Sequence, residues 1–441
     1  MSPGDSSPLR PSSVLVLSAI LLGASPAAAQ LEVGTASADV TPDPGGRMYG
    51  YGARGAEPSR GVHDPLVARA LVAFDGRTKV ALVTLDLGYV DTDVTSRARA
   101  AVADAIGLND VLITASHTHS GPALAAGGQT TELQYADELV QAITSAVVEA
   151  DANRTRAKLA AGWGRLEEGH NRRRVLPDGT VEMRWANRDR RPTNPVDHTI
   201  GVLAFDTLAG APIATLVNFA CHPVVLGPEN LELSADYPGS LVAMVDRLVG
   251  GQTMFLQGAA GDINPFWDKT PPAEGAFEES QRMGEALARE VLRVRADVTG
   301  YEDTPWVSLH RDVVALGPRW DIGDARVQAG VGTDAIARFE RERDAEIATL
   351  LFGPSVAIAM FPGEFFVEHG LQLKQQSMVR HTLFVGYANG HAGYFPTIRA
   401  AAEGGYGADS STIVELGAGE HLVNRALINL HFQAGKLSAL P

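Results

Sequence analysis

The stretch Val111–Pro122 reads VLITASHTHSGP, and the prediction of the fold starts from it. Its apolar beginning is typical of a buried strand, and Ser-Gly-Pro is typical of a turn. Residues two positions apart on an extended backbone point to the same face, so we expect His117 and His119 to share one pocket while Thr118 points away. A metal ion plus a reacting group would satisfy both imidazoles. The other interpretation is a pair of surface histidines at a turn.

A second apolar run, Pro212–Ala220 (PIATLVNFA), also leads into a histidine. Adjacent residues on an extended chain face opposite sides, so we assign Cys221 to the core and His222 to the pocket. Cys221 is the only cysteine, which excludes an intrachain disulfide. The fold must therefore be held by its core, with a metal ion as a further candidate.

Two more apolar runs end in a candidate site residue. Ser355–Phe361 is closed by Pro-Gly-Glu, which places Glu364 at the C-terminal end of a strand, and Thr382–Tyr387 opens into a loop-like segment that holds Tyr394. Strands that alternate with helices predict an α/β fold, here one large mixed-sheet domain with helices packed on the sheets. Ligands gather at the C-terminal ends of strands in such folds, and two histidines with one carboxylate suit Zn²⁺ and leave a position for water.

Apolar residues at helical spacing predict the helices of this domain. They are expected at Ser96–Ile106, Leu133–Asp151, Gly239–Leu248, Glu278–Val298, Gly332–Leu350, Phe365–Gln376 and near Gly419–Leu430. We assign these helices to packing.

The N-terminus has the layout of a bacterial secretory signal peptide. Arg10 precedes the apolar run Val14–Gly23, and the small residues of Ala24–Gln30 follow it. We predict a signal peptide over 1–29, one folded domain over 30–441, and a secreted or periplasmic protein. The run is too short to span a bilayer, and no later segment is predicted to do so.

Composition narrows the possible partners. The chain has 441 residues, of which 45% are hydrophobic, and its formal net charge is −15. An acidic chain without a long basic run is a poor nucleic-acid binder, so no nucleic-acid partner is expected.

Three loops carry further candidates. Gly169–Arg174 (GHNRRR) is either a solvated hairpin or a segment in which one arginine turns inward to hold an oxyanion. In Gly258–Pro265 (GAAGDINP), Asp262 is a candidate to orient a histidine, and the Asn264 amide is a candidate donor to an oxyanion. A plain turn is the other interpretation of that loop. The glycine-rich, aromatic loop Met48–Gly61 is long enough to line a pocket.

The ordered set of motifs resembles the neutral/alkaline (non-lysosomal) ceramidase family over nearly the whole chain after the signal segment. The motifs that carry the resemblance are ASHTHSGP, GHNRRR, NFACHPVVLG, GAAGDINP, FPGEFF and YFPTIRAAAEGGYGADSS. The resemblance implies a zinc amidohydrolase with one zinc ion per chain and a lipid-like or N-acyl substrate, and hence contact with a membrane surface.

The same resemblance assigns the roles. It implies His117, His222, Glu364 and Tyr394 as the zinc ligands, and it implies His119, Arg172 and Tyr406 as catalytic groups. The two tyrosines keep the family's spacing of twelve residues.

Two departures from the family pattern bear on the substrate. Asn264 stands where ceramidases have a serine that is required for activity; an amide is no nucleophile but can hydrogen-bond a hydroxyl or an oxyanion. Ceramidases also carry a C-terminal β-sandwich-type domain, whereas this sequence ends at Pro441. Two alternatives to ceramide hydrolysis therefore stay open: a zinc hydrolase of another amide or ester, and a non-catalytic zinc-containing protein that binds a lipid.

Overall fold

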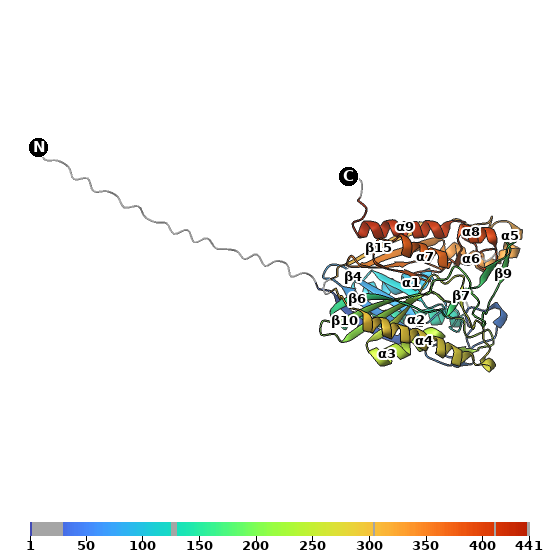
Figure 1. The fold of residues 1–441 in the computed structure, drawn as a ribbon, viewed down its shortest axis with the longest axis horizontal. Helices are drawn as coiled ribbons and strands as arrows, with labels where there is room; N and C mark the ends of the chain where they lie inside the picture. Colours follow the sequence, from blue (N-terminus) through green and yellow to red (C-terminus); the bar gives the residue numbers. More distant parts are fainter. Residues whose placement is uncertain (2–29, 125–129, 303–304, 410–411, 439–441) are drawn as a thin grey trace.

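The computed structural model describes residues 1, 30–124, 130–302, 305–409 and 412–438 (Figure 1). The predicted signal peptide thus lies almost entirely outside the described residues. Among the helices of the described part, none combines the length and the apolar character needed to cross a bilayer.

The largest sheet has eight strands, in two halves joined by a short pairing between β1 and β6. Neighbouring strands run antiparallel except at the two edges, where β4 pairs with β5 and β11 with β13 in parallel. In spatial order the strands are β13 (Gln252–Gln257), β11 (Pro212–Phe219), β10 (Thr199–Thr207), β6 (Thr155–Arg165), β1 (Glu32–Asp39), β3 (Val67–Phe74), β4 (Lys79–Leu85) and β5 (Val111–Ala115).

A second sheet of four strands packs on one face of the first. Its strands, in spatial order, are β15 (Val307–Ala315), β16 (Asp344–Phe352), β17 (Val356–Met360) and β19 (His381–Val385). One apolar cluster joins the two sheets, with Leu112 and Leu216 from the first and Leu350 and Ile358 from the second, all at most 1% exposed. Burial of these side chains is the main force that holds the sheets face to face.

Helices cover both outer faces, so the molecule has four layers in the order helix, sheet, sheet, helix (Figure 1). The first sheet packs against α1 (Thr92–Ile106), α2 (Thr130–Ala152), α3 (Tyr237–Val249) and α4 (Ala276–Asp297). The second packs against α6 (Thr333–Glu342), α7 (Val367–Gln376) and α9 (Ala418–Gln433). This architecture agrees with the predicted mixed-sheet α/β domain.

The remaining elements are short. They are β2 (Gly61–Val62), β7 (Gly169–Asn171), β8 (Arg173–Val175), β9 (Val181–Met183), β12 (Glu232–Leu233), β14 (Ile263–Pro265), β18 (Glu364–Phe365), β20 (Tyr394–Phe395), α5 (Ala325–Val331) and α8 (Ile398–Glu403), with 3₁₀ turns at Gly52–Arg54 and Pro272–Glu274.

The helix predicted over Gly332–Leu350 is wrong in its second half. The helix α6 ends at Glu342, and β16 begins at Asp344 between two partner strands. A short continuous apolar run fits a buried strand as well as a buried helix, and here pairing with β15 and β17 decides for the strand.

The two edges of the large sheet meet around the loop that follows β19. The Asn389 backbone N–H donates to the Ile113 carbonyl over 2.8 Å, and the Gly386 N–H donates to the Gln257 carbonyl over 2.9 Å. The Gln257 amide in turn donates to the Ser116 carbonyl over 3.0 Å. These bonds bring the C-terminal ends of β5, β13 and β19 to one place.

Candidate functional site

His117 and His119 do face the same pocket, but not through an extended strand. The strand β5 ends at Ala115, and His117 lies in the following loop with a φ of 70°, a conformation uncommon for a non-glycine residue. The Thr118 hydroxyl points elsewhere and donates to the Ser234 carbonyl over 2.8 Å. A left-handed turn therefore aims the two rings, because the chain must leave the strand before it reaches them.

A backbone carbonyl fixes the ring of each of two buried histidines, His117 and His222. His117 Nδ1 lies 2.6 Å from the Gly88 carbonyl oxygen, and His222 Nδ1 lies 2.6 Å from that of Ala260. Because a carbonyl only accepts, both Nδ1 atoms carry a proton, and each Nε2 is the ring nitrogen that is left to bind a metal or, when protonated, to donate to a carboxylate. Metal-binding histidines have this arrangement.

Glu364 completes the cluster. Its Oε2 lies 3.3 Å from His117 Nε2 and 3.2 Å from His222 Nε2, and its side chain is 6% exposed. Burial opposes ionisation, but His117 and His222 outweigh it and hold the pKa of this carboxyl well below its usual range. The carboxylate is therefore charged at neutral pH.

These separations fit a tetrahedral metal site. Two ligands about 2.0–2.1 Å from a zinc ion lie about 3.3–3.4 Å from each other. Both Nε2–Oε2 distances match this value, and His119 Nε2 lies 3.2 Å from His117 Nε2. One ring nitrogen from each of His117, His119 and His222 lies within 4.8 Å of the other two. The side chains present therefore fit a divalent metal ion.

Arg172 is the arginine that turns inward from the basic segment. It is 3% exposed and donates to the Gly261 carbonyl over 2.7 Å, to Asn264 Oδ1 over 3.1 Å and to the Tyr394 hydroxyl over 3.3 Å. Its guanidinium also lies 5.2 Å from the ring centre of Tyr406, a half-exposed side chain. Arg172, Tyr394 and Tyr406 thus form one wall beside the histidine cluster.

The GDINP loop differs from its prediction. Asp262 was expected to orient a histidine, but it accepts from the Val367 backbone N–H over 2.8 Å and from the Asn171 amide over 2.6 Å. Backbone carbonyls orient the histidines in its place. Asn264, the predicted donor to an oxyanion, lies beside Arg172, but its amide already donates to Asp268 Oδ2 over 2.8 Å.

The sequence did not single out three residues of the site: Gly50, Tyr51 and His391. The Met48–Gly61 loop does line the pocket: the Tyr51 ring centre is 4.9 Å from that of His119, and a Cβ added at Gly50 would lie 2.4 Å from the His119 ring. His391 Nε2 lies 3.7 Å from Glu364 Oε1. The histidine in ANGHAGYF, just before Tyr394, was the available signal.

Two cavities open on the cluster and share Tyr51, His119, Tyr394 and Tyr406 in their walls. The larger, of about 590 Å³, contains Glu364, and the smaller, of about 230 Å³, contains Arg172 and Asn264.

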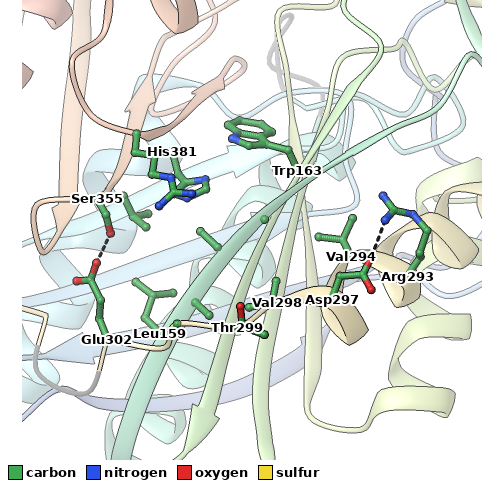
Figure 2. A pocket seen from close by; sticks show the side chains of 16 residues that line it. Leu159, Trp163, Arg293, Val294, Asp297, Val298, Thr299, Glu302, Ser355 and His381 are labelled. Carbon is green, nitrogen blue, oxygen red and sulfur yellow. Dashed lines mark hydrogen bonds and ion pairs between the residues drawn. The ribbon is translucent and has the colours of Figure 1, made fainter.

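Another cavity, of about 560 Å³, lies between β6 and the end of α4, with Trp163 and His381 on one side (Figure 2). None of the predicted site residues lines it. In its wall Arg293 pairs with Asp297 at 2.7 Å, and the Ser355 hydroxyl donates to Glu302 (Figure 2). We assign no site there.

Residues 31–278, more than half of the chain, match the family described as neutral/alkaline non-lysosomal ceramidase, N-terminal. The chain belongs to this family. The neutral ceramidase of Pseudomonas aeruginosa is 26% identical over 367 residues, which cover 73% of this chain and 52% of that protein. The neutral ceramidase of Mycobacterium tuberculosis is 26% identical over 288 residues, 58% of this chain and 44% of the relative. The chain thus spans about half the length of these curated relatives.

Solved structures agree on the fold. The crystal structure of neutral ceramidase from Pseudomonas aeruginosa superposes with a TM-score of 0.75 at 18% identity and covers 93% of this chain and 75% of that one. A structure described as ceramidase complexed with C2 gives the same TM-score and identity and covers 77% of that chain. The α/β architecture of the family is therefore confirmed for this chain.

Proposed function

We propose that this protein is a secreted zinc-dependent hydrolase that cleaves the N-acyl amide bond of ceramide or a related lipid. The observation that carries the proposal is the convergence of His117, His222 and Glu364, with both Nδ1–H groups fixed on carbonyls and the remaining donor atoms 3.2–3.3 Å apart. Membership of the ceramidase family supports the reaction type.

We propose one Zn²⁺ per chain, held by His117, His222, Glu364 and Tyr394. Such an ion supplies a water molecule acidified toward neutrality and polarises the substrate carbonyl. Burial and the nearby Glu364 raise the pKa of Tyr394 well above its usual value, and Arg172, which donates to its hydroxyl, opposes this only in part. A bound zinc ion would supply the rest of the stabilisation that a phenolate ligand needs. The proximity of His119 Nε2 to His117 Nε2 makes His119 the other candidate for the fourth position.

The remaining groups act on the substrate. Burial, with His117 and His222 nearby, lowers the pKa of His119 well below its usual value, so the ring is neutral and accepts a proton. It then passes the proton to the leaving amine. The Arg172 guanidinium and the Tyr406 hydroxyl stabilise the negative charge on the carbonyl oxygen, and Asn264 holds Arg172 in place.

Asn264 favours a second candidate, a zinc hydrolase for another amide or ester. Its amide occupies the position of the family serine, and both ends of that amide already have partners. A substrate hydroxyl that needs the serine thus finds a different group. Comparing ceramide with short N-acyl amides, in the native chain and in Asn264→Ser, separates the two. Strong ceramide hydrolysis by the native chain would refute the second candidate.

The proposal is tested by metal analysis of the purified protein, followed by product detection with a panel of N-acyl lipids. We expect one zinc per chain, release of fatty acid, and loss of both in the double variant His117→Ala/His222→Ala. Unchanged zinc content and hydrolysis in that variant would refute the site. Stoichiometric zinc and lipid binding without product under any condition would identify a binding protein instead.

We also propose that residues 1–29 are removed on export and that 30–441 form the hydrolase domain. N-terminal sequencing of the protein recovered outside the cytoplasm is expected to begin at Gln30. An intact N-terminus on the exported protein would contradict this boundary.

A further inference from the structure

The smaller of the two cavities at the site is positively charged. Arg172 and Lys269 both line it, and among the described residues no aspartate or glutamate does. The larger cavity contains charges of both signs, Glu132 and Glu364 with Arg47 and Arg338, together with apolar side chains such as Met48, Leu124 and Phe339. The two halves of a substrate that lies across the cluster therefore meet different surroundings.

Lys269 is held toward the cavity by several contacts. Its ammonium lies 4.3 Å from the Trp185 ring centre and 5.9 Å from that of Tyr51, two other residues of the cavity wall. Its backbone has a φ of 53°, and its N–H donates to the Val224 carbonyl over 2.8 Å, just beyond His222. A non-glycine residue in this conformation costs energy, and such residues cluster at functional sites.

The partner of Lys269 stands behind it. Asp268 Oδ2 lies 2.7 Å from the Lys269 ammonium, and the Asp268 side chain is fully buried, whereas that of Lys269 is 32% exposed. The ammonium has three donors, and the carboxylate behind it takes one of them. Lys269 therefore presents charge to the cavity and can donate to a ligand there.

The geometry points to a substrate whose amine half carries a small acidic group, an N-acyl amino acid, with Lys269 as the residue that recognises its carboxylate. This inference rests on the proposed amide hydrolysis. The larger cavity with its apolar side chains takes the acyl chain, and the cavity of about 230 Å³ takes the compact anion. Water adds across the amide, the C–N bond breaks, and the products are a fatty acid and a free amino acid.

Lys269 is proposed to determine specificity, so its test compares the kcat/KM values of an acidic and a neutral substrate. The substrates are N-decanoylglycine and its neutral analogue N-decanoylglycinamide, and decanoate release gives kcat/KM for each. A hydrogen-bonded charge pair predicts that the native zinc-loaded protein prefers the carboxylate by about tenfold or more. Lys269→Met is expected to remove most of that preference.

Two further variants control the test. Lys269→Met leaves Asp268 buried without its cation, so Asp268→Asn/Lys269→Met keeps the local charge balanced and is expected to lose the preference while it stays folded. Lys158→Met is the matched control: its ammonium also lies over an aromatic ring, 4.6 Å from the Tyr301 ring centre, but it lines neither cavity. It should leave the ratio unchanged.

Calorimetry on chelator-treated protein separates recognition from hydrolysis. We expect N-decanoylglycine to bind more tightly than the glycinamide, and this difference to be lost in both Lys269 variants. That result supports carboxylate recognition even if neither compound is hydrolysed. The absence of hydrolysis would then refute only the proposed hydrolysis. Hydrolysis of both compounds at equal kcat/KM, unchanged in the Lys269 variants, would overturn the inference and leave the hydrolase proposal standing.

Discussion

Removal of His222 should abolish the stabilisation of the fold by zinc. A metal that binds only the native state adds about 2.7 kcal/mol to the free energy of unfolding when its free concentration is a hundred times its Kd. For a chain of 441 residues, an unfolding entropy of about 2.1 cal/mol/K per residue amounts to about 0.9 kcal/mol/K. Zinc is therefore expected to raise the Tm of the native protein by about 3 °C.

The assay is differential scanning calorimetry of chelator-treated protein with and without added zinc. In His222→Ala the zinc-induced shift should fall below about 1 °C, because one of the fixed Nε2 lone pairs is gone. Each shift is measured within one variant, so the loss of packing at this buried position does not enter the comparison.

The matched control is His63→Ala, since the His63 side chain is 44% exposed and stacks on Phe277 away from the cluster. It should keep the full shift. An equal zinc shift in His222→Ala, or none in the native protein, would refute the site. Tyr394→Phe and His119→Ala identify the fourth ligand, and our assignment expects only the former to weaken zinc binding.

Three further predictions concern stability and geometry. Asp262→Ala should lower the free energy of unfolding by about 2–6 kcal/mol, measured in urea, because two buried donors lose their acceptor. Burial raises the pKa of Asp236 to about 7, above the unfolded value of about 4. The stabilising contribution of this group is therefore complete below pH 4 and is lost as the pH rises through 7. Over that range the free energy of unfolding of the native protein should fall by up to about 4 kcal/mol relative to that of Asp236→Asn. Gly50→Ala should lower kcat at least about tenfold at unchanged zinc content. The reason is that the added Cβ would lie 2.4 Å from the His119 ring and that the glycine has a φ of +106°. An unchanged kcat would show that the position of this ring does not limit the reaction.

Much of the fold could be predicted from local patterns. The apolar runs that lead to His117, His222 and Glu364 are strands in the structure, and α4 lies within two residues of its predicted bounds. The helix α4 is buried on one face, so its apolar residues repeat with the period of a helix. The three strands are buried along their length, so the prediction of these strands rests on short apolar runs that end at turn residues. The error at β16 shows the limit, because its sequence, DAEIATLLF, directly follows a helix, and only pairing with β15 and β17 makes it a strand.

The chemistry of the site could be predicted only by residue type. The sequence placed His222 in the pocket and Cys221 in the core, and the structure has them there. It did not predict the carbonyls of Gly88 and Ala260, which set the histidine tautomers, nor the engagement of Asp262 with Val367. Backbone carbonyls have no signature in a sequence, so contacts of this kind are invisible until the chain has folded.

The sequence by itself determined that Val111–Pro122 is a strand followed by two histidines, and that other strands end in a third histidine and a glutamate. Only the tertiary structure decided that these ends meet, because the edges β5 and β13 are joined through the loop after β19. Only the structure placed Lys269 at the same cavity as Arg172. Contacts between residues far apart in the chain depend on how whole sheets pack, which no local pattern specifies.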